Sequence, residues 1–181
     1  MNIATQTFEG VFDADVNHSS IEAEVRHMGV GSFRTRLEDV SARLVSDGAG
    51  VRLDGTAAVE SISIRKPPEF REHVVNGEDF FDARNHPQIR FKSDRITLGE
   101  DGTIDLTGEL TIKDITRPIT ATGSFRPPIE DPYGGVRAAI DLTATIDRRQ
   151  FGLGWQAQLP NGGNVLGWDV TIDVHLELVR V

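Results

Sequence analysis

The residues with the clearest chemical potential are the charged triplet Asp147-Arg148-Arg149, which follows an alternating apolar pattern. An arginine binds a phosphate or carboxylate through two parallel N–H groups, so the triplet could hold the anionic headgroup of a lipid. In the structural interpretation, one arginine pairs with Asp147 and fixes the strand end against a turn at Phe151-Gly152. We favour the structural interpretation, and interpret Arg117, which precedes Pro118, in the same way.

Two of the five histidines lie where a ligand could meet them. His27 falls on the apolar side of an alternating segment, and His73 falls on the apolar side of a helical pattern. Each could hydrogen-bond a ligand headgroup at the mouth of a cavity, or could be a buried histidine with a partner inside the protein. A zinc site needs three or four converging ligands, and the sequence has no His-x-His or His-x-x-x-His spacing. We therefore expect no metal.

The sequence lacks the common motifs of catalysis and cofactor binding. It has no Gly-x-Ser-x-Gly nucleophile turn, no P-loop and no glycine-rich dinucleotide fingerprint. It also has no cysteine, which excludes disulfides and thiolate metal sites. We expect a protein that is not an enzyme and that has no cofactor other than a bound lipid.

Strands must position these residues. From Val136 to Ile146, apolar and polar residues alternate, the period of a strand with one dry and one wet face. A pattern of this length favours the tilted strands of a barrel over the shorter strands of a sandwich. Alternation recurs in about eight segments, joined by turns such as Asp47-Gly48 and Asp101-Gly102. The sequence therefore predicts an all-β, eight-stranded antiparallel barrel.

One insertion, at about residues 67–84, interrupts the strands. Phe70, His73 and Val74 recur at helical spacing after a Pro-Pro pair, and Asn76-Gly77 is a typical helix end. Residues 78–83 predict a second short helical turn. It ends before His86-Pro87, because a proline disfavours helical geometry in the residue that precedes it. We expect this helical cap to close one end of the barrel or to lie over its opening.

Length and charge limit the function further. A chain of 181 residues is one domain, residues 1–181. Its formal net charge of −9 disfavours nucleic acids and anionic membrane surfaces as partners. The first residues resemble no signal peptide, and no apolar run approaches the ~20 residues of a membrane span. We expect a cytoplasmic protein without a membrane span.

The barrel interior can be either packed or hollow. Inward positions of the predicted strands carry mainly Ala, Val, Ile, Leu and Gly, whereas most phenylalanines lie in connections or near strand ends. An eight-stranded barrel is just wide enough to be filled by side chains or to hold one ligand. This pattern favours a lined cavity slightly, and a solid core remains the alternative.

The chain resembles the YceI-like family of small bacterial proteins. Matching segments follow one another in the family's order and spacing over nearly the whole chain, and they include Phe80-Phe81-Asp82-Ala83 in the insertion. Where the family often has a polar residue and an asparagine beside a tryptophan, this chain has Gly154 and Gln156 around Trp155. Trp168 stands where an acidic residue commonly precedes the last strand. The matching segments are residues 15–21, 25–30, 33–36, 71–74, 80–83, 86–91, 108–119 and 146–153.

The resemblance implies a lipocalin-like barrel that binds and carries or sequesters an elongated amphiphilic lipid, such as a polyisoprenoid, an isoprenoid quinone or a fatty-acid-like molecule. It also implies a homodimer, which the sequence itself does not show, and the family includes periplasmic members. Two alternatives stay open: a barrel enzyme that folds an apolar substrate for cyclisation or isomerisation, and a solid-core stress or adaptor protein.

Alternation and the position of the cap give a set of expected ligand-binding residues. Most belong to the apolar strand faces, and the aromatic ones surround the opening. The set is Val25, His27, Met28, Phe33, Phe70, His73, Phe80, Phe81, Phe91, Ile140, Leu142, Trp155, Ile172, Val174 and Leu176.

Overall fold

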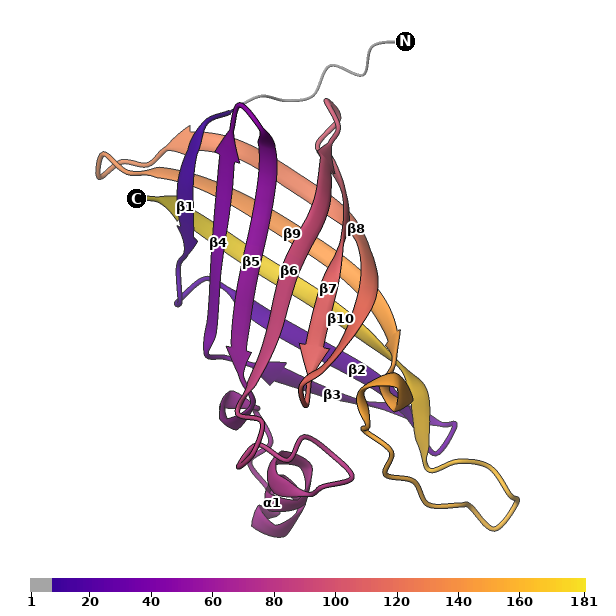
Figure 1. Cartoon of the computed structure of the whole chain (residues 1–181). Coiled ribbons are helices and arrows are strands. Elements are labelled where there is room, and N and C mark those ends of the chain that lie inside the picture. The colour runs from indigo at the N-terminus through magenta and orange to yellow at the C-terminus, as the bar shows by residue number, and fades with distance from the viewer. Residues whose placement is uncertain (1–7) are drawn as a thin grey trace.

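Ten strands form one antiparallel sheet in the computed structural model, which describes residues 8–181 (Figure 1). Three short helical elements interrupt them. The elements in chain order are β1 (Gly10–Ala14), β2 (Ser20–His27), β3 (Gly31–Leu37), β4 (Val40–Asp47), β5 (Gly50–Ala58), the 3-10 turn η1 (Val59–Ser61), α1 (Pro68–Asn76), β6 (Gln88–Leu98), β7 (Thr103–Ile112), β8 (Ile115–Glu130), β9 (Val136–Asp147), the 3-10 turn η2 (Arg148–Phe151) and β10 (Leu166–Arg180).

Eight of these strands close a barrel. The strands β4 to β10 pair in chain order, and β1 pairs with both β4 and β10, which closes the ring. The eight-stranded antiparallel barrel predicted from the sequence is therefore confirmed. The remaining two strands extend the ring rather than join it: β2 lies along β10 beyond the end of β1, and β3 pairs with β2.

Strand β10 explains why there are ten strands where about eight were predicted. It is fifteen residues long, and it pairs with β1 through Leu178–Arg180 and with β2 through 166–175. Strands β1 and β2 therefore follow one another along the same edge of β10, separated by a short turn. The last residue of β3, Leu37, forms an isolated antiparallel bridge with Ile62, the residue that follows η1.

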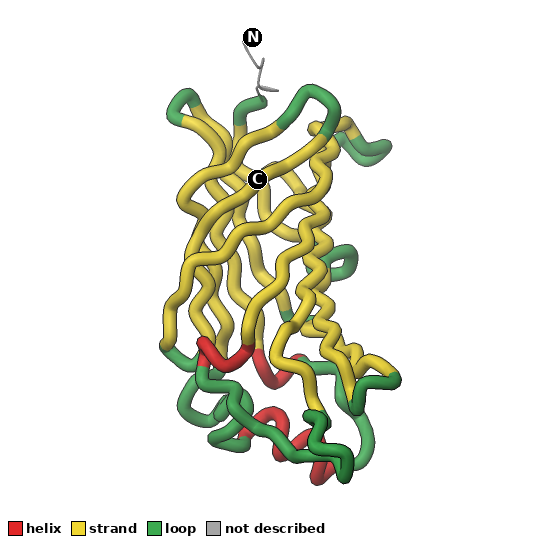
Figure 2. Tube along the Cα trace, turned by 90° about the vertical axis from the view of Figure 1, so that its right-hand side faces the viewer, coloured by secondary structure: helices red, strands yellow, loops and turns green. Residues whose placement is uncertain are grey.

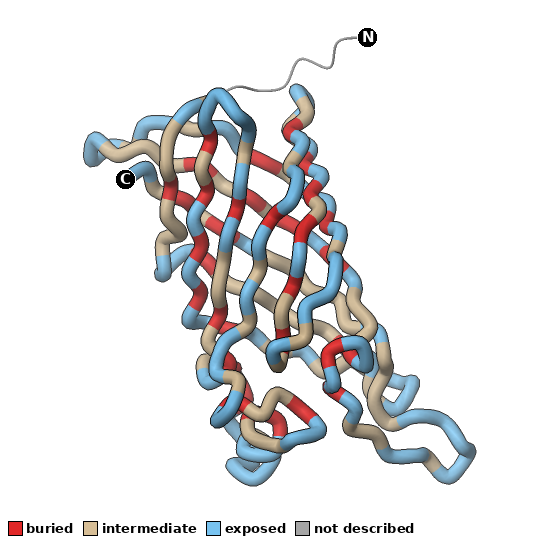
Figure 3. Tube along the Cα trace, in the orientation of Figure 1, coloured by how far each residue is buried: buried red, intermediate tan, exposed pale blue. Residues whose placement is uncertain are grey.

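The alternation read from the sequence determines which side chains enter the barrel. On β9, Ala138, Ile140, Leu142 and Ala144 are buried, while Thr143 and its outward-facing neighbours are more exposed. The same alternation of buried and less buried positions is visible along β4 and β7 in Figure 3. Because successive strand residues point to opposite faces of the sheet, the apolar residues at every second position form the interior of the barrel.

One end of the barrel is packed with large side chains. Phe12, Leu44, Ile140 and Leu178 are each at most 1% exposed. The Phe8 ring stacks on that of Phe125, with 5.3 Å between centroids, and meets that of Phe12 edge-on at 5.6 Å. Aromatic rings in such arrangements add to the energy of simple burial. We call this end of the barrel the closed end.

The helical elements lie at the opposite end (Figure 2). Helix α1 begins after Pro67 with Pro68 in its first turn, as the sequence predicts. The prediction of a second helical turn at residues 78–83 is wrong, because these residues form non-helical hydrogen-bonded turns. In these turns the N–H of Phe81 donates to Val74 O, and the N–H of Ala83 donates to Val75 O. Within residues 8–181, no helix has the length and apolar character needed to span a bilayer.

Candidate functional site

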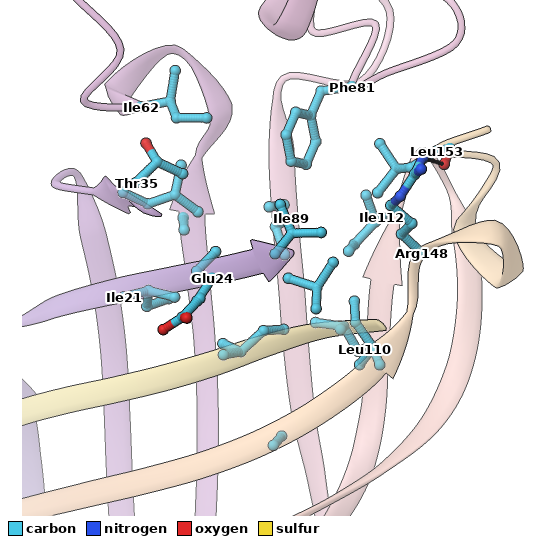
Figure 4. A pocket seen from close by; sticks show the side chains of 18 of the residues that line it. Ile21, Glu24, Thr35, Ile62, Phe81, Ile89, Leu110, Ile112, Arg148 and Leu153 are labelled. Atoms are coloured by element: carbon cyan, nitrogen blue, oxygen red, sulfur yellow. Dashed lines mark hydrogen bonds between the residues drawn. The ribbon is translucent and has the colours of Figure 1, made fainter. Parts of the chain in front are cut away.

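The barrel holds a cavity of about 630 Å³ at the end where α1 lies. This volume falls within the range of roughly 300–1,000 Å³ that is usual for small-molecule sites. Figure 4 looks into the cavity, with Ile21 and Thr35 on one side and Leu110, Ile112 and Leu153 on the other. Most of the lining side chains are aliphatic or aromatic, so the cavity suits an apolar molecule.

The cavity exists because small residues face inward in this half of the barrel. Ala42, Gly55, Ala57, Ala121 and Ala144 all line it, from strands β4, β5, β8 and β9. At the closed end, the same strands carry larger inward residues, among which are leucine, phenylalanine and isoleucine. On these strands, side-chain size therefore separates the packed part of the interior from the hollow part.

Aromatic side chains gather at the mouth of the cavity. The ring of Phe80 stacks on that of Trp155, with centroids 5.6 Å apart, and His73 meets both rings edge-on. On another side of the mouth, Phe33 of β3 packs edge-on against Phe70 of α1 at 5.7 Å. All five line the cavity, so the mouth is bordered by rings from the strands, the helix and the loop after η2.

Main-chain and side-chain hydrogen bonds hold the segment 67–87, which we call the cap, against the barrel. The N–H of Trp155 donates to Asp79 O at 3.0 Å. The Nζ of Lys113, in the turn between β7 and β8, donates to Glu78 O and also to Gly152 O at 3.1 Å. His86 Nδ1 lies 2.9 Å from a carboxylate oxygen of Asp114 in the same turn.

Arg148 forms part of the cavity wall and is 3% exposed. Its Nε donates to Gly167 O at 2.7 Å, and its Nη1 donates to Leu153 O at 2.6 Å. The guanidinium carbon lies 4.3 Å from the centroid of the Trp168 ring. Burial lowers the pKa of Arg148, but an arginine stays charged. The carbonyl groups and the indole face stabilise the buried cation.

A bulge in β10 makes the carbonyl group of Gly167 available to Arg148. The pairing of β10 with β2 shifts register between Leu166 and Val170, which leaves the intervening main chain outside the regular ladder. Gln156 uses the same stretch: its side-chain amide donates to Leu166 O at 2.6 Å and accepts from Leu166 N at 3.0 Å. The residue types at 156 and 168 that depart from the family pattern thus both contact the region around Arg148.

Arg149 makes the ion pair that the sequence suggested for this triplet. Its Nη2 lies 2.6 Å from Asp147 Oδ2, and its side chain is largely exposed. The Arg149 hydrogen bond lowers the pKa of Asp147. The carboxylate of Asp147 also accepts from the Arg149 N–H, which caps η2. The two adjacent arginines therefore have different structural roles.

A second polar cluster lies outside the cavity. The Nη1 of Arg137 donates to Asp15 and Glu177, and its Nε donates to Asp131 at 2.9 Å. The Arg137 hydrogen bond is the main reason that the pKa of Asp15 falls to about 2. Oxygen and nitrogen atoms of Asp15, His18 and Glu177 lie within 4.8 Å of one another. The Arg137 guanidinium already pairs with both carboxylates, so we interpret the cluster as an ion-pair network.

The chain is similar to known proteins over nearly its whole length. A model of the YceI-like domain matches residues 12–178, nearly the whole chain. The chain belongs to the YceI-like family. A UPF0312 protein of Pseudomonas putida strain W619 is 25% identical over 169 residues, which cover 93% of this chain and 84% of that protein. A UPF0312 protein of Vibrio parahaemolyticus is 27% identical over 150 residues, 82% and 79% of the two chains.

Solved structures share this YceI-like fold. BcnA of Burkholderia cenocepacia superposes with a TM-score of 0.71 at 22% identity, over 93% of this chain and 99% of that one. A polyisoprenoid-binding domain from Saccharophagus degradans gives a TM-score of 0.67 at 10% identity, over 96% and 100% of the two chains. At these identities the structural likeness establishes the fold.

The YceI-like barrel brings most of the expected site residues together around one cavity. Thirteen of the fifteen line it. Met28 does not: it lies in the turn between β2 and β3 with φ of 51° and is 43% exposed. Ile140 does not line it either, because it is packed in the closed end at 1% exposure. The residues that line the cavity are Val25, His27, Phe33, Phe70, His73, Phe80, Phe81, Phe91, Leu142, Trp155, Ile172, Val174 and Leu176.

Several lining residues of this YceI-like cavity are absent from the expected set. Ala42, Leu53, Leu106 and Ala121 line it from strands on the far side of the barrel from β2. The sequence shows the alternation that directs Ala42 of β4 and Leu106 of β7 inward. It does not show how far along each strand a cavity extends. Lys113 was also missed, since a lysine in a hairpin turn gives no signal in the sequence of its contact with the cap.

Proposed function

We propose that this protein binds one elongated amphiphilic lipid, with the apolar tail inside the barrel and the headgroup at the mouth. The observation that carries the proposal is the cavity of about 630 Å³, with its almost wholly apolar walls, inside a YceI-like barrel. Transfer of a tail from water into such a space contributes about 0.8 kcal/mol per CH₂ group. Burial alone therefore supplies affinity, and few specific contacts are needed.

The distribution of polar groups supports a tail-inward orientation. His27 is the last residue of β2, His73 belongs to the cap, and Arg148 follows the end of β9, so all three lie toward the mouth. Deeper in the barrel, the lining consists of alanine and leucine side chains such as Ala42 and Leu142. A headgroup that needs hydrogen bonds is served better at the mouth than at depth.

The ligand classes that we propose are a polyisoprenoid, an isoprenoid quinone or a fatty-acid-like lipid. Family membership supports this choice, and a structural neighbour with the same fold is a polyisoprenoid-binding domain. The physiological role that follows is to carry or sequester the lipid.

Binding is supported over catalysis by the state of the polar groups at the mouth. His73 is hydrogen-bonded to Asp79 at 2.9 Å, and Arg148 is held by main-chain carbonyl groups. Both are therefore engaged in positioning the wall and the cap. Trp155 and Phe80 are stacked on each other beside them and offer surface rather than reactive groups.

The tryptophan in the wall provides a direct test. Trp155 lines the cavity, so entry of a tail should change its fluorescence, whereas Trp168 lies behind Arg148. We expect saturable quenching or a shift of emission on titration with geranylgeraniol or oleate, and no change with glycerol. The response should be lost in Trp155→Phe and kept in Trp168→Phe. Absence of any response, together with no lipid retained on gel filtration, would contradict the proposal.

A further inference from the structure

The cavity ends abruptly at one level of the barrel. On each of six strands, the lining stops at one residue. On five of them the next large inward residue toward the closed end is buried, and on β5 the next one, Val51, is partly buried against the core. We call these last lining residues the floor. The floor consists of Ala42, Leu53, Leu106, Ala121, Leu142 and Leu176.

A packed layer lies directly behind the floor. On β9, Leu142 lines the cavity, while Ile140, the next inward residue, is 1% exposed and does not. On β10, Leu176 and Leu178 stand in the same relation. The step from hollow to packed is therefore one inward position on these strands, and the barrel is blocked beyond it.

Aromatic rings make this layer resistant to a tail. On β8, the inward positions after Ala121 are Gly123, which has no side chain, and Phe125, which is 2% exposed. The Phe125 ring is held by the stacked ring of Phe8, which also contacts Phe12. Because close-packed interiors yield little, a tail cannot extend past this group by small adjustments.

We propose that the floor, backed by the packed layer, limits the length of the lipid tail and so determines which chain lengths bind. This inference rests on the proposed binding of a lipid tail in the barrel. A tail that fits up to the floor gains the burial of every methylene group, whereas a longer tail must leave part of its length in water at the mouth. The floor residues are thus specificity-determining residues.

Two substitutions on the floor should move the length limit in opposite directions. Ala121→Leu adds side-chain volume to the empty space, which should shorten the longest tail that binds fully without unfolding the barrel. Leu142→Ala removes volume and should lengthen that tail. The control is Ala139→Leu, because Ala139 faces outward on the same strand as Leu142.

The experiment measures the affinity of each variant for isoprenoid alcohols that differ by one isoprene unit, with folding checked by thermal unfolding. For Ala121→Leu we expect the longest alcohol that the unmodified protein binds well to bind about tenfold more weakly, since two CH₂ groups account for about that factor. Shorter alcohols should be unaffected, and Leu142→Ala should shift the preference toward longer alcohols.

The outcomes separate this inference from the proposed function. If the unmodified protein binds alcohols but neither floor variant changes the length profile relative to Ala139→Leu, the floor does not set the limit and the inference is wrong. If no alcohol or fatty acid of any length binds the unmodified protein, the proposed function is wrong, and the inference about the floor is wrong as well. If Leu142→Ala unfolds, Ala121→Leu alone still decides.

Discussion

The ammonium group of Lys113 donates to the carbonyl oxygen of Glu78, and so connects the β7–β8 turn to the cap over the cavity. The same group also donates to Gly152 O in the segment that leads to Trp155. One side chain thereby joins two of the segments that surround the mouth. Both Lys113 and Asp114 have positive φ, at 53° and 57°, the geometry of a tight hairpin turn.

Loss of this connection should loosen the cap. In Lys113→Ala, we expect amide hydrogens of residues 77–83 to exchange about tenfold faster, which corresponds to about 1.4 kcal/mol less free energy for local opening. The rate of lipid release should rise in parallel. Hydrogen exchange followed by mass spectrometry measures the opening of the cap. The control is Lys92→Ala, at an exposed position on β6. Unchanged exchange in the cap would show that Lys113 does not hold it.

The two adjacent arginines should respond differently to truncation. Arg148→Ala removes the donors to Gly167 O and Leu153 O inside the wall, so we expect the free energy of unfolding to fall by about 2–4 kcal/mol. Arg149→Ala removes an exposed ion pair with Asp147, for which we expect little change. Urea unfolding of both variants compares them. Equal effects would contradict the assignment of Arg148 as the buried structural arginine.

Acid stability should depend on Asp15. The Arg137 hydrogen bond holds the pKa of Asp15 at about 2 in the folded protein, below the value of about 3.9 for an unfolded chain. The folded state is therefore stabilised above pH about 4, and this contribution is lost as the pH falls toward 2. Asp15→Asn should make unfolding free energy less steep in pH over this window.

The matched control for Asp15→Asn is Asp94→Asn, at an exposed position on β6. Urea titrations at several pH values below 5 give the slope for each variant and for the unmodified protein. If Asp15→Asn leaves the slope of unfolding free energy against pH unchanged, the Arg137 network does not determine the loss of stability in acid.

A hollow interior and a packed one predict opposite results for a bulky substitution. Ala144 lines the cavity, so Ala144→Phe should block lipid binding while leaving the unfolding free energy unchanged or higher. Ala138, on the same face of β9, is packed in the closed end at 4% exposure. Ala138→Phe should therefore cost about 1–3 kcal/mol through overpacking. Thermal unfolding and fluorescence titration of the pair test this, and equal destabilisation would indicate a solid core.

The sequence predicts the strands well because a barrel strand needs only local alternation. On β9 that pattern correctly assigned the inward residues from Ala138 to Ala144. It could not separate Leu142 from Ile140, since both are inward and apolar. What separates them is the set of buried rings at the level of Ile140, above all Phe125, its partner on the neighbouring strand β8, and Phe12 on β1.

The remaining differences have the same origin in tertiary contacts. Residues 78–83 were predicted to be helical, but the N–H groups of Phe81 and Ala83 donate to carbonyl groups of α1 rather than into a new helix. Arg148 and Arg149 are indistinguishable in sequence. The first of them receives carbonyl groups from two distant places, Gly167 in the β10 bulge and Leu153 in the segment after η2. The exposed position of Met28 follows from its place in a hairpin turn, where alternation stops.

The most direct test of lipid binding is native mass spectrometry of the gently purified protein, followed by organic extraction and identification of what is released. Our account predicts a stoichiometric adduct with the mass of an isoprenoid or fatty lipid, present in the unmodified protein and absent in Ala144→Phe. A bare protein mass that persists after incubation with polyprenyl and fatty lipids would contradict it, and would show that the cavity is not a lipid site.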